Sequence, residues 1–268
     1  MDSILPQTIG FEGPDGTNKT RFSLTVCNLL RLCEQKVLYC PYPNPHTAAG
    51  LLLGNNQRFE PRIASEALPA LQAASRAETL PLLNYWIAKG SQHWIVFDRT
   101  KYSGEAYARA SGEKDLEWLR ALDRYFPDPE LGFYLVRPLE ESLKIAGRRD
   151  ETSIVKDELD KNIQLQARIR EIYPQILQGK KNWTSLNVSG IADNLEEFQR
   201  WEIKVGMEIW GTISTYFGNE NWLMDGESLV KESLLGPFNQ TNIMREMELI
   251  RSANLWREYG SKRTNVER

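Results

Sequence analysis

The chain has 268 residues, 41% hydrophobic and 10% aromatic, which is enough apolar material for one large domain, or one domain with an extension. This composition excludes a chain that is disordered throughout. The net charge of −3 gives no electrostatic reason to expect a nucleic-acid partner. No apolar run reaches the length of a membrane span, and the N-terminal segment lacks the pattern of a secretion signal. We therefore expect a cytoplasmic protein that does not enter a membrane.

The cysteines and histidines exclude several kinds of site. Cys27, Cys33 and Cys40 are an odd number at irregular spacing in apolar surroundings, so we expect free, reduced thiols in the core. His46 and His93 lie far apart and near no cysteine pair. This arrangement argues against a zinc site and against a histidine-dependent catalytic triad.

Five short runs rich in β-branched and aromatic residues predict strands, at residues 7–12, 36–40, 93–98, 131–136 and 184–189. Their apolar character is continuous, which is typical of strands buried on both faces. Segments with helical periodicity alternate with them, at residues 19–35, 62–90, 114–126, 156–178 and 194–217. The alternation predicts an α/β fold with a parallel sheet, in which ligands bind at the carboxyl ends of the strands.

The first predicted strand leads into a near match to the phosphate-binding pattern G-x-x-x-x-G-K-[ST]. Gly13, Lys19 and Thr20 have the required spacing, whereas Asn18 replaces the second glycine. Asparagine tolerates a positive φ better than most residues, so this replacement weakens the motif without abolishing it. Lys19 would reach the β- and γ-phosphates and the Thr20 hydroxyl would hold Mg²⁺. The alternative is an ordinary strand–turn–helix connection.

A second candidate motif follows the strand at residues 93–98. Asp98 and Arg99 leave the carboxyl end of this strand in the sequence VFDRTKYSGEAYA. The carboxylate is suited to Mg²⁺ or its waters, and the guanidinium to bridging phosphates during transfer. A solvated ion pair is the alternative interpretation.

Together, FEGPDGTNKT and DRTKYSGEAYA resemble the thymidylate kinase family, whose patterns are F-E-G-x-D-G-x-G-K-[ST] and D-R-Y-x-x-S-x-x-A-[YF]. Segments 43–53, 73–90 and 127–151 are also similar, in the same order, so the resemblance covers roughly residues 5–200. It implies a five-stranded parallel sheet flanked by helices, of the P-loop NTPase type. It also implies a nucleoside monophosphate kinase that transfers the γ-phosphate of Mg·ATP to dTMP.

The resemblance assigns roles to residues at matching positions. The residues implied to bind ATP are Gly13, Gly16, Thr17, Asn18, Lys19 and Thr20. The residues implied to bind the acceptor nucleotide are Asp15, Thr47, Gln72, Arg76, Ser103, Gly104 and Tyr107. Arg99 would bridge the phosphates, and Thr20 and Asp98 would hold the metal.

The residue at position 16 indicates which part of the chain supplies the catalytic cation. Some family members carry an arginine at this position, so the glycine here implies that the cation comes from elsewhere. Arg148 and Arg149 lie in a predicted lid at residues 146–160 and resemble the lid arginines of bacterial members. The alternative is a solvated basic patch at a helix end.

Two departures from the family pattern fall on the acceptor side. Pro45 stands where the family has an arginine for the acceptor phosphate, and Gln72 where it has an aromatic residue. Arg58 and Arg62 are candidate replacements for the missing cation. Two alternatives to dTMP phosphorylation therefore stay open: a same-fold kinase for another or modified deoxypyrimidine, free or in DNA, and a non-catalytic nucleotide-binding relative.

The C-terminal part has no counterpart in the resemblance. We expect a kinase domain at residues 1–205 and a helical extension at 206–268 that packs on it. Trp210, Trp222 and Trp256 are interpreted as packing anchors, with a binding surface as the alternative. The resemblance also allows a homodimer, because the family commonly pairs through helices on one face of the sheet.

Overall fold

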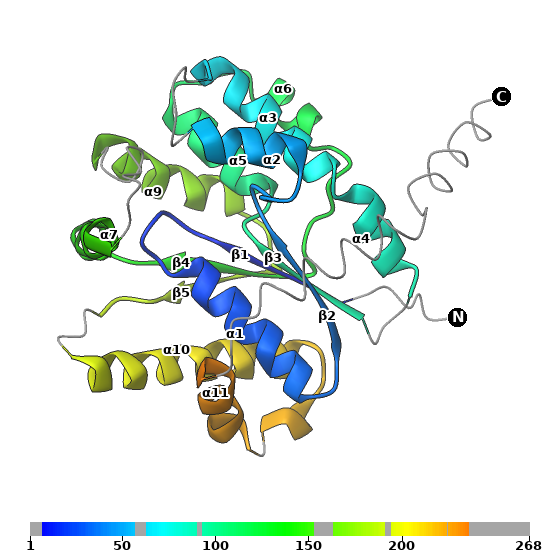
Figure 1. Ribbon diagram of the computed structural model, residues 1–268, viewed down its shortest axis with the longest axis vertical. Coiled ribbons are helices and arrows are strands. Elements are labelled where there is room, and N and C mark those ends of the chain that lie inside the picture. The colour runs from blue at the N-terminus through cyan, green and yellow to red at the C-terminus, as the bar shows by residue number, and fades with distance from the viewer. Residues whose placement is uncertain are drawn as a thin grey trace.

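The computed structural model describes residues 7–56, 63–89, 93–152, 163–190, 194–223 and 225–235. Its centre is a sheet of five parallel strands in the order β2-β3-β1-β4-β5 (Figure 1). The strands are β1 (Gln7–Glu12), β2 (Lys36–Pro41), β3 (His93–Asp98), β4 (Leu131–Val136) and β5 (Trp183–Asn187). The predicted five-stranded parallel sheet is therefore confirmed.

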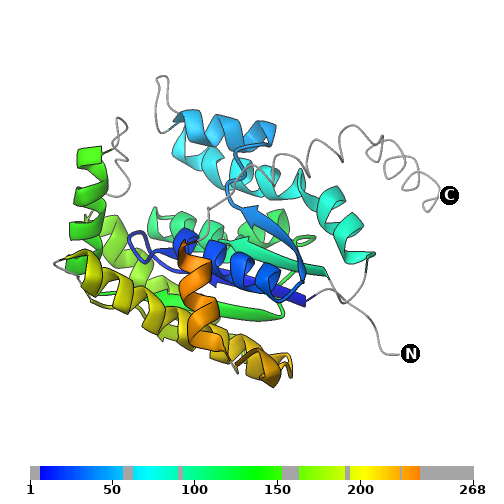
Figure 2. The ribbon, with the colours of Figure 1, turned by 60° about the horizontal axis from the view of Figure 1, so that its bottom comes forward.

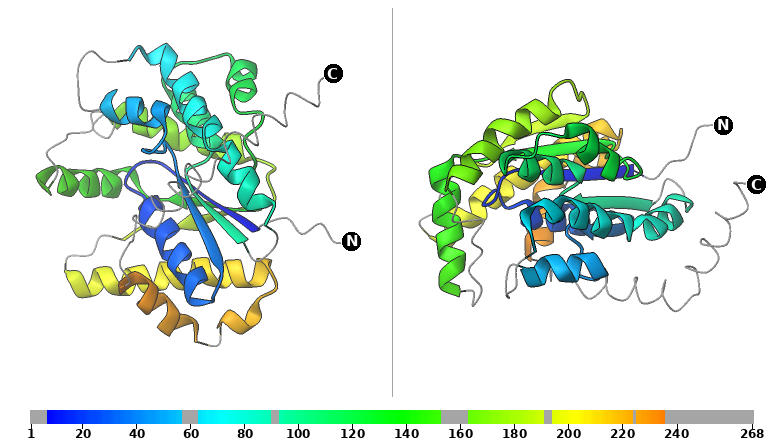
Figure 3. Two further views of the ribbon diagram at one scale, coloured as in Figure 1. Left: turned by 45° about the vertical axis from the view of Figure 1, so that its right-hand side comes forward. Right: turned by 90° about the horizontal axis from the view of Figure 1, so that it is seen from above.

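The longer helices are α1 (Lys19–Leu32), α2 (Ala48–Asn56), α3 (Leu68–Ala77), α4 (Leu80–Ile87), α5 (Lys101–Ala110), α6 (Leu116–Leu122), α7 (Leu139–Thr152), α9 (Ile163–Leu177), α10 (Leu195–Tyr216) and α11 (Gly226–Leu235). Figure 1 shows α1, α10 and α11 on one face of the sheet and α5 and α9 on the other. Helix α7 projects from the carboxyl edge of the sheet (Figure 3).

Side-chain alternation along the central strands separates the core into two layers. Ile9 and Phe11 of β1 are fully buried against the layer of α1 and α10. Leu38 and Cys40 of β2 are buried on the opposite face, with residues of α4. Burial on both faces explains why these strands have no polar alternation.

The edge strand β5 differs from the prediction. Thr184 and Ser185 are exposed, and only Leu186 of this strand is buried. The expectation that the fifth strand is buried on both faces is therefore wrong. Thr184, Ser185 and Asn187 are polar and stay exposed, whereas Val37 to Cys40 of β2, the other edge strand, are apolar and buried.

The segment predicted as a helix at residues 62–90 is not continuous. It is described from residue 63 and forms a short 3₁₀ turn, η1 (Ser65–Ala67), followed by α3 and α4. Pro69 and Pro81 lie in the first turns of α3 and α4. Proline is tolerated there because the first N–H groups of a helix have no intrahelical acceptor, which explains why each helix restarts at these residues.

The described C-terminal helices pack on the helix that follows the phosphate loop. Helix α10 runs unbroken through the expected domain boundary at residue 205, and α11 lies against both α1 and α10 (Figure 2). Arg21 of α1 forms an ion pair of 2.6 Å with Glu202 of α10. Asn28 of α1 donates a hydrogen bond of 3.1 Å to the carbonyl of Ser233. These contacts tie α1 to residues outside the resemblance.

Aromatic stacking supports the same packing. The rings of Trp210 and Trp222 are stacked at 5.0 Å, and Trp222 lies 5.8 Å from Trp94 of β3. Trp256 lies outside the described residues. None of the three cysteines forms a disulfide, and Cys27 and Cys40 are buried. No described helix combines the length and the apolar composition that a membrane crossing requires.

Candidate active site

The phosphate-loop motif occupies the connection between β1 and α1. Three of its residues have a positive φ: Gly13 at 149°, Gly16 at 81° and Asn18 at 62°. Asn18 thus has the left-handed conformation, in which asparagine is the most suitable substitute for glycine. The replacement is compatible with the backbone of the loop.

Gly16 is required by packing as well as by conformation. A Cβ atom at this position would lie 2.8 Å from the Cα and Cβ atoms of Ser142 in α7. The backbone of α7 approaches the loop too closely for any side chain at Gly16. The arginine that some family members carry here is therefore incompatible with this placement of α7. Arg137, just before α7, also donates to the carbonyl of Gly16 at 3.2 Å.

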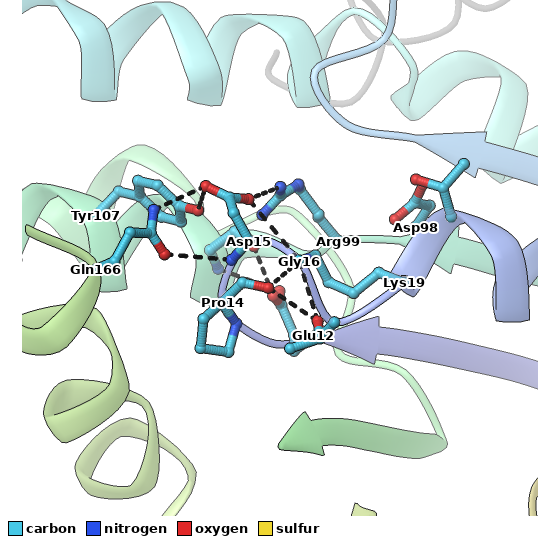
Figure 4. A network of polar contacts seen from close by, with 12 residues as sticks. Glu12, Pro14, Asp15, Gly16, Lys19, Asp98, Arg99, Tyr107 and Gln166 are labelled. Carbon is cyan, nitrogen blue, oxygen red and sulfur yellow. Dashed lines mark hydrogen bonds and ion pairs between the residues drawn. The ribbon is translucent and has the colours of Figure 1, made fainter. Parts of the chain in front are cut away.

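Lys19 is folded into the loop. Its Nζ donates to the carbonyl of Pro14 at 2.7 Å and lies 4.0 Å from the Asp15 carboxylate, and its side chain is 5% exposed (Figure 4). Burial lowers the pKa of Lys19 to about 7. The positive charge of Arg99 also lowers this pKa, whereas the negative charge of Asp15 raises it. Desolvation is the main cause that disfavours the ammonium, and an anion bound beside Nζ would favour it.

Asp98 is the best candidate ligand for a metal. The Thr20 hydroxyl donates to its Oδ2 at 2.6 Å, and the Tyr39 hydroxyl donates to the same oxygen at 3.0 Å. Its Oδ1 is buried and has no hydrogen-bond partner among the described residues. Mg²⁺ is commonly held by one or two carboxylates together with water and substrate phosphates. The free lone pairs of Oδ1, beside the loop threonine, fit such an ion.

Asp15 connects the loop to two other elements. It pairs with Arg99 at 2.6 Å, accepts from the Tyr107 hydroxyl, and accepts from Nε2 of Gln166 at 2.9 Å (Figure 4). Burial opposes ionisation of Asp15, but Arg99 and Lys19 outweigh it and hold the pKa of this carboxyl well below its usual range. Asp15 is therefore a charged group at the junction of the loop, α5 and α9.

Arg99 has an unusual backbone. Its φ is 72°, and its N–H donates to the carbonyl of Phe11 at 3.0 Å. A left-handed conformation costs a non-glycine residue free energy, and it persists only where surrounding contacts impose it. Here it turns the guanidinium toward Asp15 and the Tyr107 ring, 5.7 Å from the ring centre.

Glu12 joins the end of β1 to the start of α5. Its fully buried carboxylate accepts from the backbone N–H of Thr100 at 2.6 Å and of Ser103 at 3.1 Å. The hydroxyls of Thr100, Ser103 and Tyr173 donate to it as well. The predicted acceptor residue Ser103 is thus fixed by Glu12, a residue to which the sequence alone assigned no role.

Three of the remaining predicted acceptor residues lie together. Gln72, Arg76 and Gly104 meet where α3 packs on α5, since a Cβ on Gly104 would lie 2.8 Å from Arg76 and 3.4 Å from Gln72. Arg76 is buried and doubly hydrogen-bonded to Asp123, at 2.7 and 2.6 Å. A cavity of about 380 Å³, lined in part by Gln72 and Tyr107, opens beside them. It is the candidate acceptor pocket.

Comparison with known proteins identifies the family. The thymidylate kinase family model matches residues 11–198. The chain belongs to the thymidylate kinase family. A probable thymidylate kinase from Pyrococcus abyssi is 31% identical over 196 residues, which cover 69% of this chain and 90% of the relative. The thymidylate kinase of Dictyostelium discoideum is 28% identical, covering 69% of this chain and 79% of the relative.

Other matches are partial. The similarity spans 61% of the Plasmodium falciparum thymidylate kinase and 62% of the probable thymidylate kinase of Thermococcus gammatolerans. The solved thymidylate kinase of Candida albicans is similar with a TM-score of 0.57, at 24% identity, over 75% of this chain and 94% of that chain. This last similarity supports the fold alone.

In this member of the thymidylate kinase family, no contact among the described residues links several of the predicted residues to the site. Thr47 is buried, and its hydroxyl lies 2.9 Å from the Asn44 carbonyl and accepts from the N–H of Gly50 at 3.0 Å. Arg148 and Arg149 lie in α7, but their side chains are outside the described residues, as is most of the predicted lid. Arg58 and Arg62 are also outside them. Their roles stay predictions.

Sequence reasoning missed five residues that shape the site. They are Glu12, Tyr39, Asp123, Gln166 and Tyr173. Only Glu12 carried a usable signal, because a carboxylate at the end of an apolar strand must find hydrogen-bond donors when it is buried. The others are polar residues within helices, loops or strands whose partners are distant in sequence.

Proposed function

We propose that this chain is an ATP-dependent nucleoside monophosphate kinase that converts dTMP to dTDP. Family membership supports the proposal, and the observation in the molecule that carries it is the arrangement of Asp98. One oxygen of this buried carboxylate is bonded by Thr20 of the phosphate loop, while the other is available to a cation. This pairing suits a Mg·nucleotide complex at the end of β3.

In the reaction, an oxygen of the acceptor 5′-phosphate bonds to the γ-phosphorus of ATP. The bond from the γ-phosphorus to the β–γ bridging oxygen breaks, and ADP leaves. The N–H groups at the start of α1 face the donor phosphates. Lys19 exchanges the Pro14 carbonyl, its present acceptor at 2.7 Å, for phosphate oxygens. No covalent intermediate with the protein forms.

Arg99 and Asp15 organise the space between donor and acceptor. We assign the bridging of the phosphates to Arg99, whose guanidinium is held within hydrogen-bonding distance of Asp15. Asp15, with Tyr107, faces the acceptor sugar, beside the cavity between α3 and α5. Thr20 and Asp98 are the residues that would hold Mg²⁺, which when bound neutralises charge on the nucleotide phosphates.

The test is an assay of ADP release across an acceptor panel. The panel contains dTMP, dUMP, dCMP, UMP and a 5-modified dUMP at equal concentrations, with Mg·ATP as donor. We expect the highest kcat/KM for dTMP. Replacement of Lys19 by Met removes the cation while preserving length, and is expected to lower kcat/KM at least about a hundredfold. Turnover of a different acceptor only, or no turnover at all, contradicts the proposal.

Two expectations remain predictions from the sequence. A cytoplasmic location and a homodimer are compatible with the family, and sedimentation of the purified protein tests the second. The partners expected for the reaction are the two small-molecule nucleotides, with ATP and Mg²⁺ as the donor complex.

A further inference from the structure

Two hydroxyl groups share one oxygen of the candidate metal ligand Asp98. The Thr20 hydroxyl donates to its Oδ2 at 2.6 Å, and the Tyr39 hydroxyl donates to the same atom at 3.0 Å. The donors come from different elements, because Thr20 lies in the first turn of α1 and Tyr39 lies in β2. The Mg·nucleotide site proposed above gives a role to Asp98 and Thr20 but none to Tyr39.

Tyr39 is held in place by the sheet and by the layer of α1. It is 4% exposed and belongs to the same core cluster as Val37, two residues earlier on the strand. Alternate side chains of a strand point to the same face, so both residues face the layer of α1. The N–H of Tyr42, just after β2, donates to the carbonyl of Asp98 at 2.9 Å. The end of β2 therefore holds Asp98 through its backbone as well as through its carboxylate.

The two donors together fix the orientation of the carboxylate. The terminal torsion of an aspartate side chain has only a broad preference, so a single donor leaves the plane of the carboxylate able to tilt. A second donor from another element restricts that rotation. Burial and the charge of Asp98 raise the pKa of Tyr39 well above its ordinary value, so the phenol keeps the proton that it donates.

Thr20 is the exposed member of this group, whereas Tyr39 and Asp98 are buried. A threonine hydroxyl has one proton, and Thr20 donates it to Asp98. The lone pairs of the Thr20 oxygen therefore stay available to a cation. If the carboxylate tilted away, the hydroxyl could rotate and turn its proton toward the cation, which would weaken binding.

We propose that Tyr39 is a positioning residue for Mg²⁺, which holds Asp98 in the orientation that accepts the Thr20 proton. The proposal rests on the Mg·nucleotide site of the proposed function and adds a residue that acts through Asp98. Hydrogen-bond partners of metal ligands commonly change metal affinity or activity by about 10–100-fold. Tyr39 therefore affects the affinity for Mg²⁺ and not the affinity of the loop for phosphate itself.

Tyr39→Phe removes the hydroxyl donor and keeps the buried ring. Calorimetry measures the Kd of the non-hydrolysable β,γ-imido analogue of ATP with excess Mg²⁺ and again with EDTA. The ratio of the two Kd values is the gain in affinity that the metal provides. We expect Tyr39→Phe to lower this gain about tenfold and to leave the Kd in EDTA unchanged within about twofold.

Tyr42→Phe is the matched control. Tyr42 is also 4% exposed, but its hydroxyl lies 2.6 Å from the hydroxyl of Thr79 and forms no printed contact with the Asp98 carboxylate. Each variant loses one buried hydrogen bond, and urea unfolding measures what each loss costs in stability and shows that both are folded. Only Tyr39→Phe should change the gain in affinity from Mg²⁺.

Two results overturn the role of Tyr39 alone: a gain from Mg²⁺ in Tyr39→Phe equal to that of the wild type, or an equal loss of this gain in both variants. A wild-type chain that gains no affinity from Mg²⁺ overturns the Mg·nucleotide site itself, and the role of Tyr39 with it. Because the experiment contains no acceptor nucleotide, its result is independent of whether the chain phosphorylates dTMP.

Discussion

Replacement of Glu12 gives a direct test of how the site is assembled. The Glu12 carboxylate is fully buried, and its Oε1 accepts from two backbone N–H groups, those of Thr100 and Ser103. Both groups belong to the start of α5, where a negative charge also interacts favourably with the helix dipole. Glu12→Ala removes the acceptor and leaves both N–H groups buried.

The expected loss of stability follows from these contacts. Two buried backbone donors without acceptors, at about 1–3 kcal/mol each, lower the free energy of unfolding by about 2–6 kcal/mol. The hydroxyls of Ser103 and Tyr173 lie 2.9 Å apart and can bond to each other, so they add little. Glu12→Gln keeps a carbonyl oxygen for the two N–H groups but loses the charge, and its amide nitrogen cannot accept from the Ser103 and Tyr173 hydroxyls. Because these hydroxyls can bond to each other, we expect a cost of about 1–2 kcal/mol.

Urea denaturation followed by circular dichroism measures both variants against the wild-type chain. The order of stability should be wild type, then Glu12→Gln, then Glu12→Ala. A loss below about 1 kcal/mol for Glu12→Ala would refute the reasoning, as would equal losses for both variants, because the backbone donors would then not depend on Glu12.

Three further predictions concern the loop and the C-terminal helices. Gly16→Ala places a Cβ about 2.8 Å from Ser142 and should raise the KM for ATP; wild-type kinetics would mean that α7 does not pack on the loop. Lys19, with a pKa of about 7, is mostly neutral at pH 8, whereas bound phosphate favours its ammonium form. ATP binding at pH 8 should therefore take up about 0.9 proton and weaken as pH rises from 7, measured by calorimetry in buffers of different ionisation enthalpy. Lys19→Arg should show almost no uptake. Val230→Ala, at a fully buried position of α11, should cost about 1–2 kcal/mol in urea unfolding, and no loss would place α11 outside the folded core.

Local sequence was sufficient for the sheet and for the position of the site. The continuous apolar runs gave all five strands, since a strand buried on both faces must lack polar residues. Spacing placed Lys19 and Thr20 at the start of α1 and Asp98 at the end of β3, and parallel strands bring such ends to one edge. The same reasoning located β5 but was wrong about its burial, because Thr184, Ser185 and Asn187 are polar and exposed.

Contacts between distant segments were decided by tertiary structure alone. Gln166 reaches Asp15 across 151 residues, and Tyr173 reaches Glu12 across 161, because α9 returns over the carboxyl end of β1. From the sequence, Gly16 indicated only that this position lacks the arginine of some family members. The structure shows why it is glycine, because Ser142 lies too close to allow a side chain there. Periodicity and spacing determine which backbone segments form and where they end. Which side chains then meet depends on the order in which those segments pack, and that is a property of the whole chain.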